Sequence, residues 1–345
     1  VEHDVIGPDS LVRNIVGAQM REFGRKFYNA RARWKVASVN TLANRAADLP
    51  RSWVSQVTRV HGDEGHHYLV DNIWGRAVQI FHNARGMFPT ATPIRGDKKG
   101  LGRAPLGSGI IDALVEGPGM RWLIDNVFLT DYRLIAAGDI DMTGVAVSSS
   151  TGDFSQTGMR KRVKENPKIV GDIVEHYFAY ANGLKGITFA VDIDHATEIA
   201  NKFKSRGVRA EVISSKTPDA ERDHMMLRFK DGDLDMLVNV DLFGEGVDVP
   251  AVQVVIMARP TLSYSLYVQQ FGRALRLLVS PILRAAWHTY TVEQRAAFVA
   301  ESIKPRAIII DHVGNVFRHK GPPDMRWWDW DLSGRKSQRD DGIPM

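Results

Sequence analysis

The chain has 345 residues, of which 44% are hydrophobic and 25% are charged, so it is long enough for two packed domains and is not a disordered chain. It contains no cysteine, which excludes disulfide bonds and cysteine-bound zinc, and no apolar run approaches the roughly 20 residues of a membrane span. A formal charge of +5 and a pI near 9.3 favour a polyanionic partner without identifying it.

The first predicted elements are a helix and a strand that leads into a polar turn. Apolar residues at helical spacing predict a helix over residues 10–24 that ends at Gly24. Residues 34–39 then read as a strand followed by NTLANR. The side chains of Asn40, Thr41 and Arg45 in that segment can donate hydrogen bonds to a phosphate backbone, although an ordinary strand-to-helix turn explains them equally well.

Adjacent carboxylates follow the next predicted strand, residues 54–60, in the segment HGDEGHH. Adjacent carboxylates just beyond a strand end suit magnesium binding and water activation, because one can hold the metal shell while the other takes a proton from the attacking water. A transition-metal site is the alternative reading of this segment, and it would use His61, Asp63, His66 and His67. About 25 residues further on, TATP carries two hydroxyls, on Thr90 and Thr92.

The second half alternates strands and helices, which predicts a parallel sheet covered on both faces. One helix has a predicted inward face and ends at Gly207; that face consists of Ala196, Ile199, Ala200 and Phe203. Residues 138–157 are rich in Gly, Ser, Thr and Asp and predict an exposed loop. We expect a first domain over 1–135, a linker over 136–168, a second domain over 169–280 and a C-terminal extension over 281–345.

Two strands over residues 237–240 and 252–257 flank an acidic glycine loop with the sequence FGEGVDVP. A helix capped by Thr261 or Ser263 follows. At 100° per residue its apolar side chains share one face, while Gln269, Arg273 and Arg276 gather on the opposite face. Two guanidiniums three residues apart suit the oxygens of one phosphate group, although a solvated charged face is the ordinary reading of such a pair.

DEGHH, TATP, EGVDVP and QQFGRALR, in this order, resemble motifs II, III, V and VI of superfamily 2 helicases of the DEAD/DEAH-box type. The resemblance covers about residues 1–278 and is nearest to the bacterial and phage DNA-repair branch. It implies an α/β fold with two RecA-like domains of parallel sheets, the P-loop NTPase helicase core, the first domain being incomplete. One departure is Gly65, which stands where the family has alanine.

The resemblance also implies residue roles. Asp63 would hold magnesium with ATP, Glu64 would be the catalytic base, and Arg273 and Arg276 would reach the terminal phosphate across an inter-domain cleft. Roles in coupling ATP to movement fall on His66, His67, Gln269, Glu245, Gly246 and Asp248. Nucleic-acid contacts fall on Asn40, Thr41, Arg45, Thr90, Thr92 and Arg95.

The expected function is therefore an ATP-dependent helicase or translocase with ATP and Mg²⁺ as cofactors, acting on DNA in preference to RNA, in the cytoplasm of a bacterium or a phage-infected host. No GxxxxGK[ST] loop occurs in the sequence. We therefore expect this chain alone to bind ATP weakly without hydrolysing it, its P-loop being supplied by a missing segment or a partner. Two alternatives remain: a non-catalytic nucleic-acid-binding or regulatory module, and a metal-dependent nuclease centred on HGDEGHH.

Overall fold

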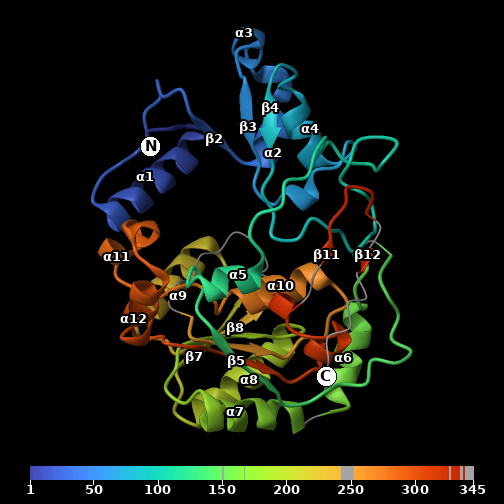
Figure 1. Cartoon of the computed structure of the whole chain (residues 1–345), viewed down its shortest axis with the longest axis vertical. Coiled ribbons are helices and arrows are strands. Elements are labelled where there is room, and N and C mark those ends of the chain that lie inside the picture. Colours follow the sequence, from blue (N-terminus) through green and yellow to red (C-terminus); the bar gives the residue numbers. More distant parts are fainter. Residues whose placement is uncertain (150, 167, 242–251, 326–327, 335–336, 339–345) are drawn as a thin grey trace. The chain divides into compact units, whose positions relative to one another are not determined.

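The computed structural model describes residues 1–149, 151–166, 168–241, 252–325, 328–334 and 337–338 (Figure 1). The chain divides into two compact units. The first unit contains Val1–Leu114 and Trp330–Lys336, and the second contains Val115–Asp329 and Ser337–Met345. Among the described residues, none of the helices has the length and apolar character that crossing a membrane requires.

The first unit consists of short elements. Its strands are β1 (Asp4–Ile6), β2 (Lys35–Ala37), β3 (Arg59–His61) and β4 (Arg85–Met87). Its helices are α1 (Asp9–Phe23), α2 (Val39–Arg45), α3 (Arg51–Val54) and α4 (Ile73–Gln79), with 3₁₀ turns at Ala46–Asp48 and Gly65–His67. The strands form two parallel pairs, β1 with β2 and β3 with β4.

Local sequence signals explain where these helices begin and end. The predicted first helix is confirmed, because α1 ends where Gly24 adopts the left-handed conformation with φ of 67° and its N–H donates to the Met20 carbonyl. The Ser38 hydroxyl caps α2 by accepting from the Thr41 N–H. The strand predicted over residues 54–60 was partly wrong, since Val54 ends the short helix α3 and only Arg59–His61 is extended.

The second unit contains a six-stranded sheet and most of the helices. Its strands are β5 (Tyr132–Ala136), β6 (Gly186–Phe189), β7 (Ala210–Ser214), β8 (Met236–Val240), β9 (Val254–Met257) and β10 (Ala307–Asp311), with a small pair β11 (Trp328–Asp329) and β12 (Ser337–Gln338). Its helices are α5 (Met120–Asp125), α6 (Gln156–Lys164), α7 (Lys168–Tyr180), α8 (Ile193–Ser205), α9 (Asp219–Asp231), α10 (Tyr264–Gly272), α11 (Pro281–Ala285), α12 (Val292–Ala300) and α13 (Asn315–Arg318), with 3₁₀ turns at Trp287–Thr289 and Pro323–Met325.

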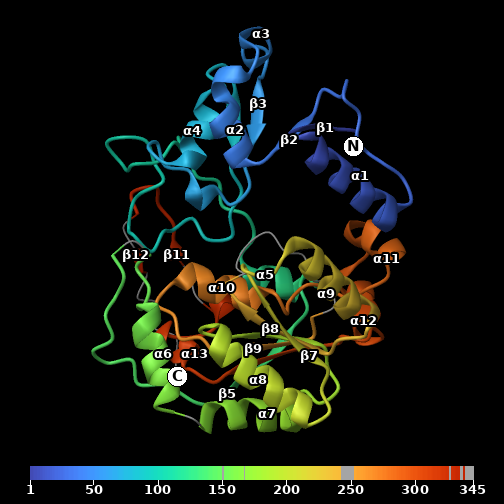
Figure 2. The ribbon, with the colours of Figure 1, turned by 180° about the vertical axis from the view of Figure 1, so that it is seen from behind.

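All neighbouring strands of the large sheet run parallel, in the order β5-β10-β9-β6-β8-β7. Figures 1 and 2 show helices on both faces of it, with α7 and α8 on one side and α5 and α10 on the other. Every residue of β6, β8 and β9 is buried. This is the pattern expected of parallel strands covered on both faces, and it confirms the predicted α/β architecture.

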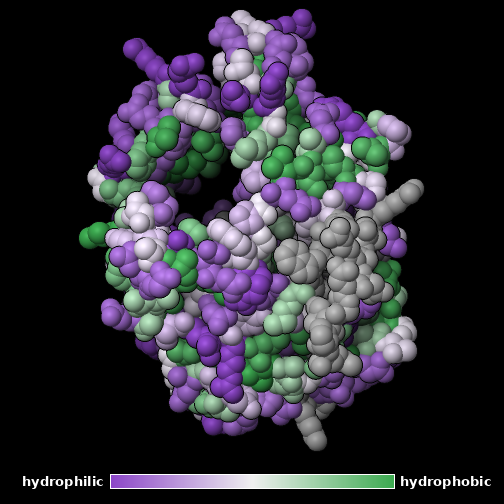
Figure 3. Space-filling view, viewed as in Figure 1, coloured by the Kyte–Doolittle hydropathy of each residue, from purple (hydrophilic) through white to green (hydrophobic). Residues whose placement is uncertain are grey.

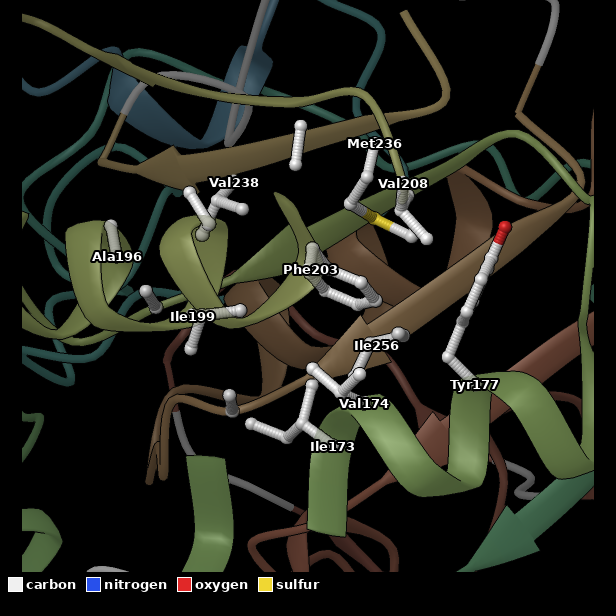
Figure 4. Packing of buried hydrophobic residues seen from close by; sticks show 14 of the residues in the cluster. Ile173, Val174, Tyr177, Ala196, Ile199, Phe203, Val208, Met236, Val238 and Ile256 are labelled. Carbon is white, nitrogen blue, oxygen red and sulfur yellow. The ribbon is translucent and has the colours of Figure 1, made fainter. Parts of the chain in front are cut away.

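The core between the sheet and α7 and α8 is built from alternate residues of the central strands (Figure 4). Met236 and Val238 of β8 and Ile256 of β9 face the two helices, because side chains two apart share a face of a strand. The inward face predicted for α8 is confirmed, since its four members Ala196, Ile199, Ala200 and Phe203 are each at most 2% exposed. Burial of each large side chain contributes about 1.5–3 kcal/mol.

The observed units differ from the domain boundaries expected from the sequence. β5 lies at the end of the expected first domain, with its last residue in the expected linker, and β10 lies inside the expected C-terminal extension. The two strands nevertheless pair with each other along their whole length. β10 also pairs with β9, so both strands belong to the sheet of the second unit. Strand pairing between distant segments leaves no local signal in a sequence, which is why a boundary drawn at composition changes missed it.

Candidate functional site

In the first unit, the pairing of β3 with β4 places the DEGHH segment beside the segment that leads to TATP. Arg59, Val60 and His61 pair with Arg85, Gly86 and Met87. The contact continues past both strands, because the Gly62 N–H donates to the Met87 carbonyl at 3.0 Å and the Gly65 N–H to the Pro89 carbonyl at 2.9 Å. Two motifs that are 25 residues apart in sequence are therefore neighbours in space.

Asp63 and Glu64 lie in the tight turn that follows β3. Glu64 adopts the left-handed conformation with φ of 51°, and its N–H donates to the Oδ1 atom of Asp63 at 2.9 Å. Asp63 is exposed. Burial of Tyr68 and, as a smaller cause, the negative charge of Asp63 raise the pKa of the Tyr68 hydroxyl to about 12. A single exposed carboxylate suits Mg²⁺, which keeps several waters and binds phosphate oxygens as well, so the residues present fit the implied metal.

The glycine that departs from the family sequence has a steric reason in this fold. A Cβ atom built on Gly65 would lie 2.2 Å from the carbonyl oxygen of Phe88, which belongs to the adjacent chain segment. Real Cβ atoms do not approach backbone so closely, so the segments can only pass at this distance with glycine here.

His66 links the acidic turn to the threonine segment. Its Nδ1 atom lies 2.9 Å from the Oγ1 atom of Thr90 and 3.6 Å from a carboxylate oxygen of Glu64. The Thr90 hydroxyl in turn donates to the Thr92 carbonyl at 3.2 Å and accepts from the Thr92 N–H. His67 stacks on Trp74 at 4.7 Å, which holds the turn against α4. The structure thus brings together Glu64, His66, Thr90 and Thr92.

Arg95 has an internal role where the sequence suggested a nucleic-acid contact. Its Nε and NH2 atoms donate to the two carboxylate oxygens of Asp97 at 2.9 and 2.7 Å, and its NH1 donates to the His66 carbonyl at 3.0 Å. Burial raises the pKa of Asp97, but the hydrogen bonds from Arg95 and from the Lys99 N–H outweigh it and leave that pKa below its ordinary value. The guanidinium therefore braces the histidine turn.

The alternative metal site at the same place is not formed. Within the part of the chain that the structure describes, no three His, Cys, Asp or Glu side chains converge as metal ligands would, and this includes the set His61, Asp63, His66 and His67.

Two of the three expected nucleic-acid contacts on α2 share one face of that helix. Thr41 and Arg45 are four residues apart, and Arg45 is exposed, as is Asn40. The Thr41 hydroxyl also lies 2.8 Å from the Ser38 hydroxyl, so the helix start is ordered by side chains. Asn40 and Arg45 therefore lie at the surface of the first unit, with Thr41 partly exposed beside them.

In the second unit, α10 carries the motif with the arginines. Ser263 caps it by accepting from the Leu266 N–H, and its predicted apolar face is confirmed, since Tyr264, Val268 and Phe271 are buried. The helix ends at Gly272, so Arg273 and Arg276 lie in the turn beyond it. Arg273 is only 8% exposed, whereas Arg276 and Gln269 are partly exposed. Both arginines were expected on the face of the helix opposite its apolar side chains; Arg276 there is partly exposed, and Arg273 is buried.

Three successive carbonyls hold the turn that carries these arginines. The Ala274 carbonyl accepts from the Lys304 amino group at 2.8 Å, the Leu275 carbonyl from the Thr130 N–H at 2.7 Å, and the Arg276 carbonyl from the Thr130 hydroxyl at 3.4 Å. Lys304 also donates to the Val252 carbonyl at 2.9 Å, and it is 1% exposed. Sequence reasoning missed Lys304, since an isolated lysine in a loop gives no sign that it is buried.

Asp153 is a second residue that the sequence did not reveal. Its Oδ2 atom accepts from the Thr261 hydroxyl at 2.8 Å and its Oδ1 atom from the Leu262 N–H at 2.6 Å, just before α10 begins. Asp153 is 5% exposed and Phe154 is 8% exposed. Residues 138–157 were expected to form an exposed loop, and this end of the segment is instead buried against the start of α10.

Three residues expected to couple ATP to movement, Glu245, Gly246 and Asp248, lie outside the described residues.

Known proteins are similar in sequence to this chain over long stretches. Residues 168–277 match the family of the helicase conserved C-terminal domain. Over 283 residues the chain is 31% identical to the 51.5 kDa protein of a Lactococcus phage, which covers 81% of this chain and 55% of the phage protein. Over 254 residues it is 28% identical to IRC3 of Saccharomyces cerevisiae, which is provisionally named an ATP-dependent helicase. This match covers 70% of this chain and 35% of the yeast protein. The chain spans about half the length of the phage relative and a third of the yeast one.

Solved structures agree on the fold. A fragment provisionally assigned to an HsdR subunit of a type I restriction enzyme from Vibrio vulnificus has a TM-score of 0.56 at 18% identity and covers 88% of this chain and 50% of that chain. The helicase Lhr of Mycobacterium smegmatis, solved with ssDNA and AMP-PNP, has a TM-score of 0.52 at 14% identity and covers 93% of this chain and 36% of that chain. At these identities the similarity establishes the RecA-like architecture alone.

Proposed function

Because the chain belongs to superfamily 2 of the helicases, we propose that it works in an ATP-driven motor that moves along or remodels nucleic acid, with DNA as the favoured track. In this proposal Asp63 holds magnesium bound to ATP, and Glu64 accepts a proton from the attacking water. When bound, the metal would neutralise charge on the phosphates.

The observation that best supports the proposal is the contact between His66 and Thr90 at 2.9 Å. A motor needs a path from the group that senses the nucleotide to the segments that move. Here the carboxylate of Glu64 lies 3.6 Å from His66, and Thr90 carries the contact to Thr92, which is 1% exposed. In this proposal a change at Glu64 reaches the buried segment through its 3.6 Å contact with His66 and then through the hydrogen bonds of Thr90.

The two arginines have different environments, which leads us to propose different roles for them. Arg276 is partly exposed and lies in a turn fixed at three carbonyls, so we assign to it the contact with the terminal phosphate. Arg273 is buried, and we assign to it the positioning of that turn. Gln269, Glu245, Gly246 and Asp248 stay predicted coupling residues.

For the track, we propose that α2 contacts the phosphate backbone through Thr41 and Arg45, with Asn40 beside them. Contacts of this kind read no sequence and weaken with salt. We place the protein in the cytoplasm of a bacterium or a phage-infected host, where ATP and DNA are both available; the phage relative supports this.

The test is ATP hydrolysis stimulated by single-stranded DNA, measured for the longest protein that the gene encodes. Glu64→Gln and Arg276→Ala should each lower kcat by a factor of about 100 or more, since a catalytic base and a phosphate-binding arginine act mainly in the transition state.

Glu116→Gln and Arg284→Ala are matched controls, because both side chains are exposed and lie outside the proposed site. Hydrolysis that survives both test changes would show that the roles are wrongly assigned. DNA binding without any hydrolysis in the wild type would instead support the non-catalytic nucleic-acid-binding module.

A further inference from the structure

The end of α1 presents cations and aromatic rings together. Residues 21–34, REFGRKFYNARARW, contain five Arg or Lys residues against one Glu, and four aromatic residues. Arg21, Arg25, Lys26, Arg31 and Arg33 are all exposed. None of these five cations forms a salt bridge with a residue that the structure describes. We call the part of this segment around Gly24, namely Arg21, Phe23, Arg25, Lys26 and Phe27, the Gly24 corner.

The Gly24 corner is a fixed structure. Gly24 turns the chain with φ of 67°, and its N–H donates to the Met20 carbonyl. The Phe27 N–H then donates to the side-chain oxygen of Gln19 at 2.7 Å, and the Phe27 carbonyl accepts from the His3 N–H at 3.0 Å. The side-chain amide of Gln19 lies 3.1 Å from the His3 ring, so the helix, the turn and the start of β1 are tied to one another.

One of the two rings of the Gly24 corner, Phe23, is open to solvent, and the other, Phe27, is partly exposed. Phe23 is 58% exposed and meets Phe27 edge to face at 5.5 Å. The guanidinium carbon of Arg25 lies 4.7 Å from the centre of the Phe27 ring. Figure 3 shows hydrophilic surface with hydrophobic residues among it in the area of α1. Exposing an aromatic ring to water is less favourable than burying it, and the end of a helix does not require an aromatic residue.

Two ordinary explanations of the cations fall short. A basic residue in the last turn of a helix stabilises its dipole, which accounts for Arg21 but not for Arg25 and Lys26 beyond the helix. A membrane-binding segment would present one continuous apolar face, whereas here cations alternate with rings. Exposed rings beside unpaired cations are the combination that binds unpaired bases and their phosphates.

We propose that the Gly24 corner is a binding surface for single-stranded nucleic acid, separate from the contacts on α2, in which Phe23 stacks on a base while Arg25 and Lys26 contact phosphates. This inference rests on the proposed function in one respect, that the partner is nucleic acid. Single strands are preferred because a duplex hides the faces of its bases from the ring of Phe23.

The experiment measures fluorescence anisotropy of a labelled oligothymidine of about 20 nucleotides and of a duplex of the same length, with the full chain, at salt concentrations between about 50 and 200 mM. Arg25→Glu with Lys26→Glu should weaken binding of the single strand about tenfold or more and make the salt dependence shallower. Phe23→Ala should weaken single-strand binding about fivefold or more and leave duplex binding nearly unchanged.

The controls match these variants in charge and exposure. Lys202→Glu with Lys204→Glu reverses two exposed cations on α8, and Phe317→Ala removes a ring that is 62% exposed in the second unit. If the wild type binds the oligonucleotide, and the test and control variants lose the same affinity, the proposal for the Gly24 corner is wrong. The proposed function would not be affected by that result. A wild type that binds no oligonucleotide, or binds only anionic vesicles, would overturn both.

Discussion

At the scale of single residues, Lys304 shows how burial changes the chemistry of a side chain. Its amino group is 1% exposed, and burial, together with the positive charge of Arg276, lowers its pKa from 10.5 to about 7. Between these two pH values the unfolded chain binds one proton more than the folded chain. Rising pH therefore stabilises the folded state between about pH 7 and pH 10.5. As the pH falls through this window the stabilisation from the neutral amine is lost, and below about pH 7 the lysine is protonated in both states.

The Lys304→Met variant tests this linkage. We expect the free energy of unfolding of the wild type, relative to the variant, to rise by about 1–3 kcal/mol between about pH 7 and pH 9.5, because only the wild type releases this proton on folding. Urea unfolding at several pH values measures the difference. The control is Lys185→Met, since Lys185 also donates to two carbonyls but is partly exposed. Equal slopes for the two variants would contradict the prediction.

Gly65 offers a second test at this scale, because alanine is the residue that the family has there. We expect Gly65→Ala to lower the free energy of unfolding by about 1–3 kcal/mol, since its Cβ would lie 2.2 Å from the Phe88 carbonyl oxygen. Gly117→Ala is the control, because a Cβ there meets nothing within 4 Å. Urea unfolding of both variants measures the effect. A Gly65→Ala protein with an unchanged free energy of unfolding would show that the two segments separate easily.

At the scale of elements, the start of α10 depends on a residue from a distant segment. Asp153→Asn keeps the size of the side chain but replaces one acceptor oxygen with an NH₂ group, which cannot accept from Thr261 or Leu262. We expect the free energy of unfolding to fall by about 1–3 kcal/mol, because a buried donor loses its partner.

Chemical unfolding of the Asp153→Asn variant provides the measurement, with Asp233→Asn as the control at an exposed position. Equal stability of the two variants would mean that water replaces the carboxylate and that the contact to α10 is dispensable.

The elements show which parts of the site could be read from sequence. The 3.6-residue period and Gly24 predicted α1, and the same period predicted the buried face of α10. The period gives the face on which Arg273 lies, but it does not reveal that this side chain is buried, because burial depends on what the rest of the fold packs against it. The proximity of His66 to Thr90 depends on the pairing of β3 with β4, and neither strand has a local signal for its partner. Lys304 and Asp153 act through distant backbone groups and were not predictable.

At the scale of the whole molecule, the sheet of the second unit defines what can fold alone. A fragment of residues 115–329 contains all six strands, so we expect it to unfold cooperatively in urea. A fragment of residues 169–280, cut at the expected boundaries, lacks β5 and β10 and leaves the side of β9 that pairs with β10 without a partner. Circular dichroism should show the shorter fragment unfolded or aggregated; cooperative unfolding of it would mean that the outer strands are dispensable.

The sequence predicted the type of architecture of the second unit, but not how many strands its sheet contains. Alternating strands and helices indicated a parallel sheet with both faces covered, and that is what the second unit contains. The predicted second domain lacked the two strands at one end of its sheet, because β5 precedes the whole of that domain along the chain and β10 follows it. Contacts of such long range are set by the fold as a whole and not by the pattern within any one segment.

The return of residues 330–334 to the first unit has a consequence for the order of folding. The Gly102 N–H donates to the Leu332 carbonyl at 2.8 Å, across more than two hundred intervening residues. Closing so long a loop in a flexible chain costs on the order of 5 kcal/mol of entropy, far more than one hydrogen bond returns. A folded second unit shortens that loop, so the late segment can settle onto Gly102 only after the large sheet has formed, and damage to the sheet will loosen a distant part of the first unit as well.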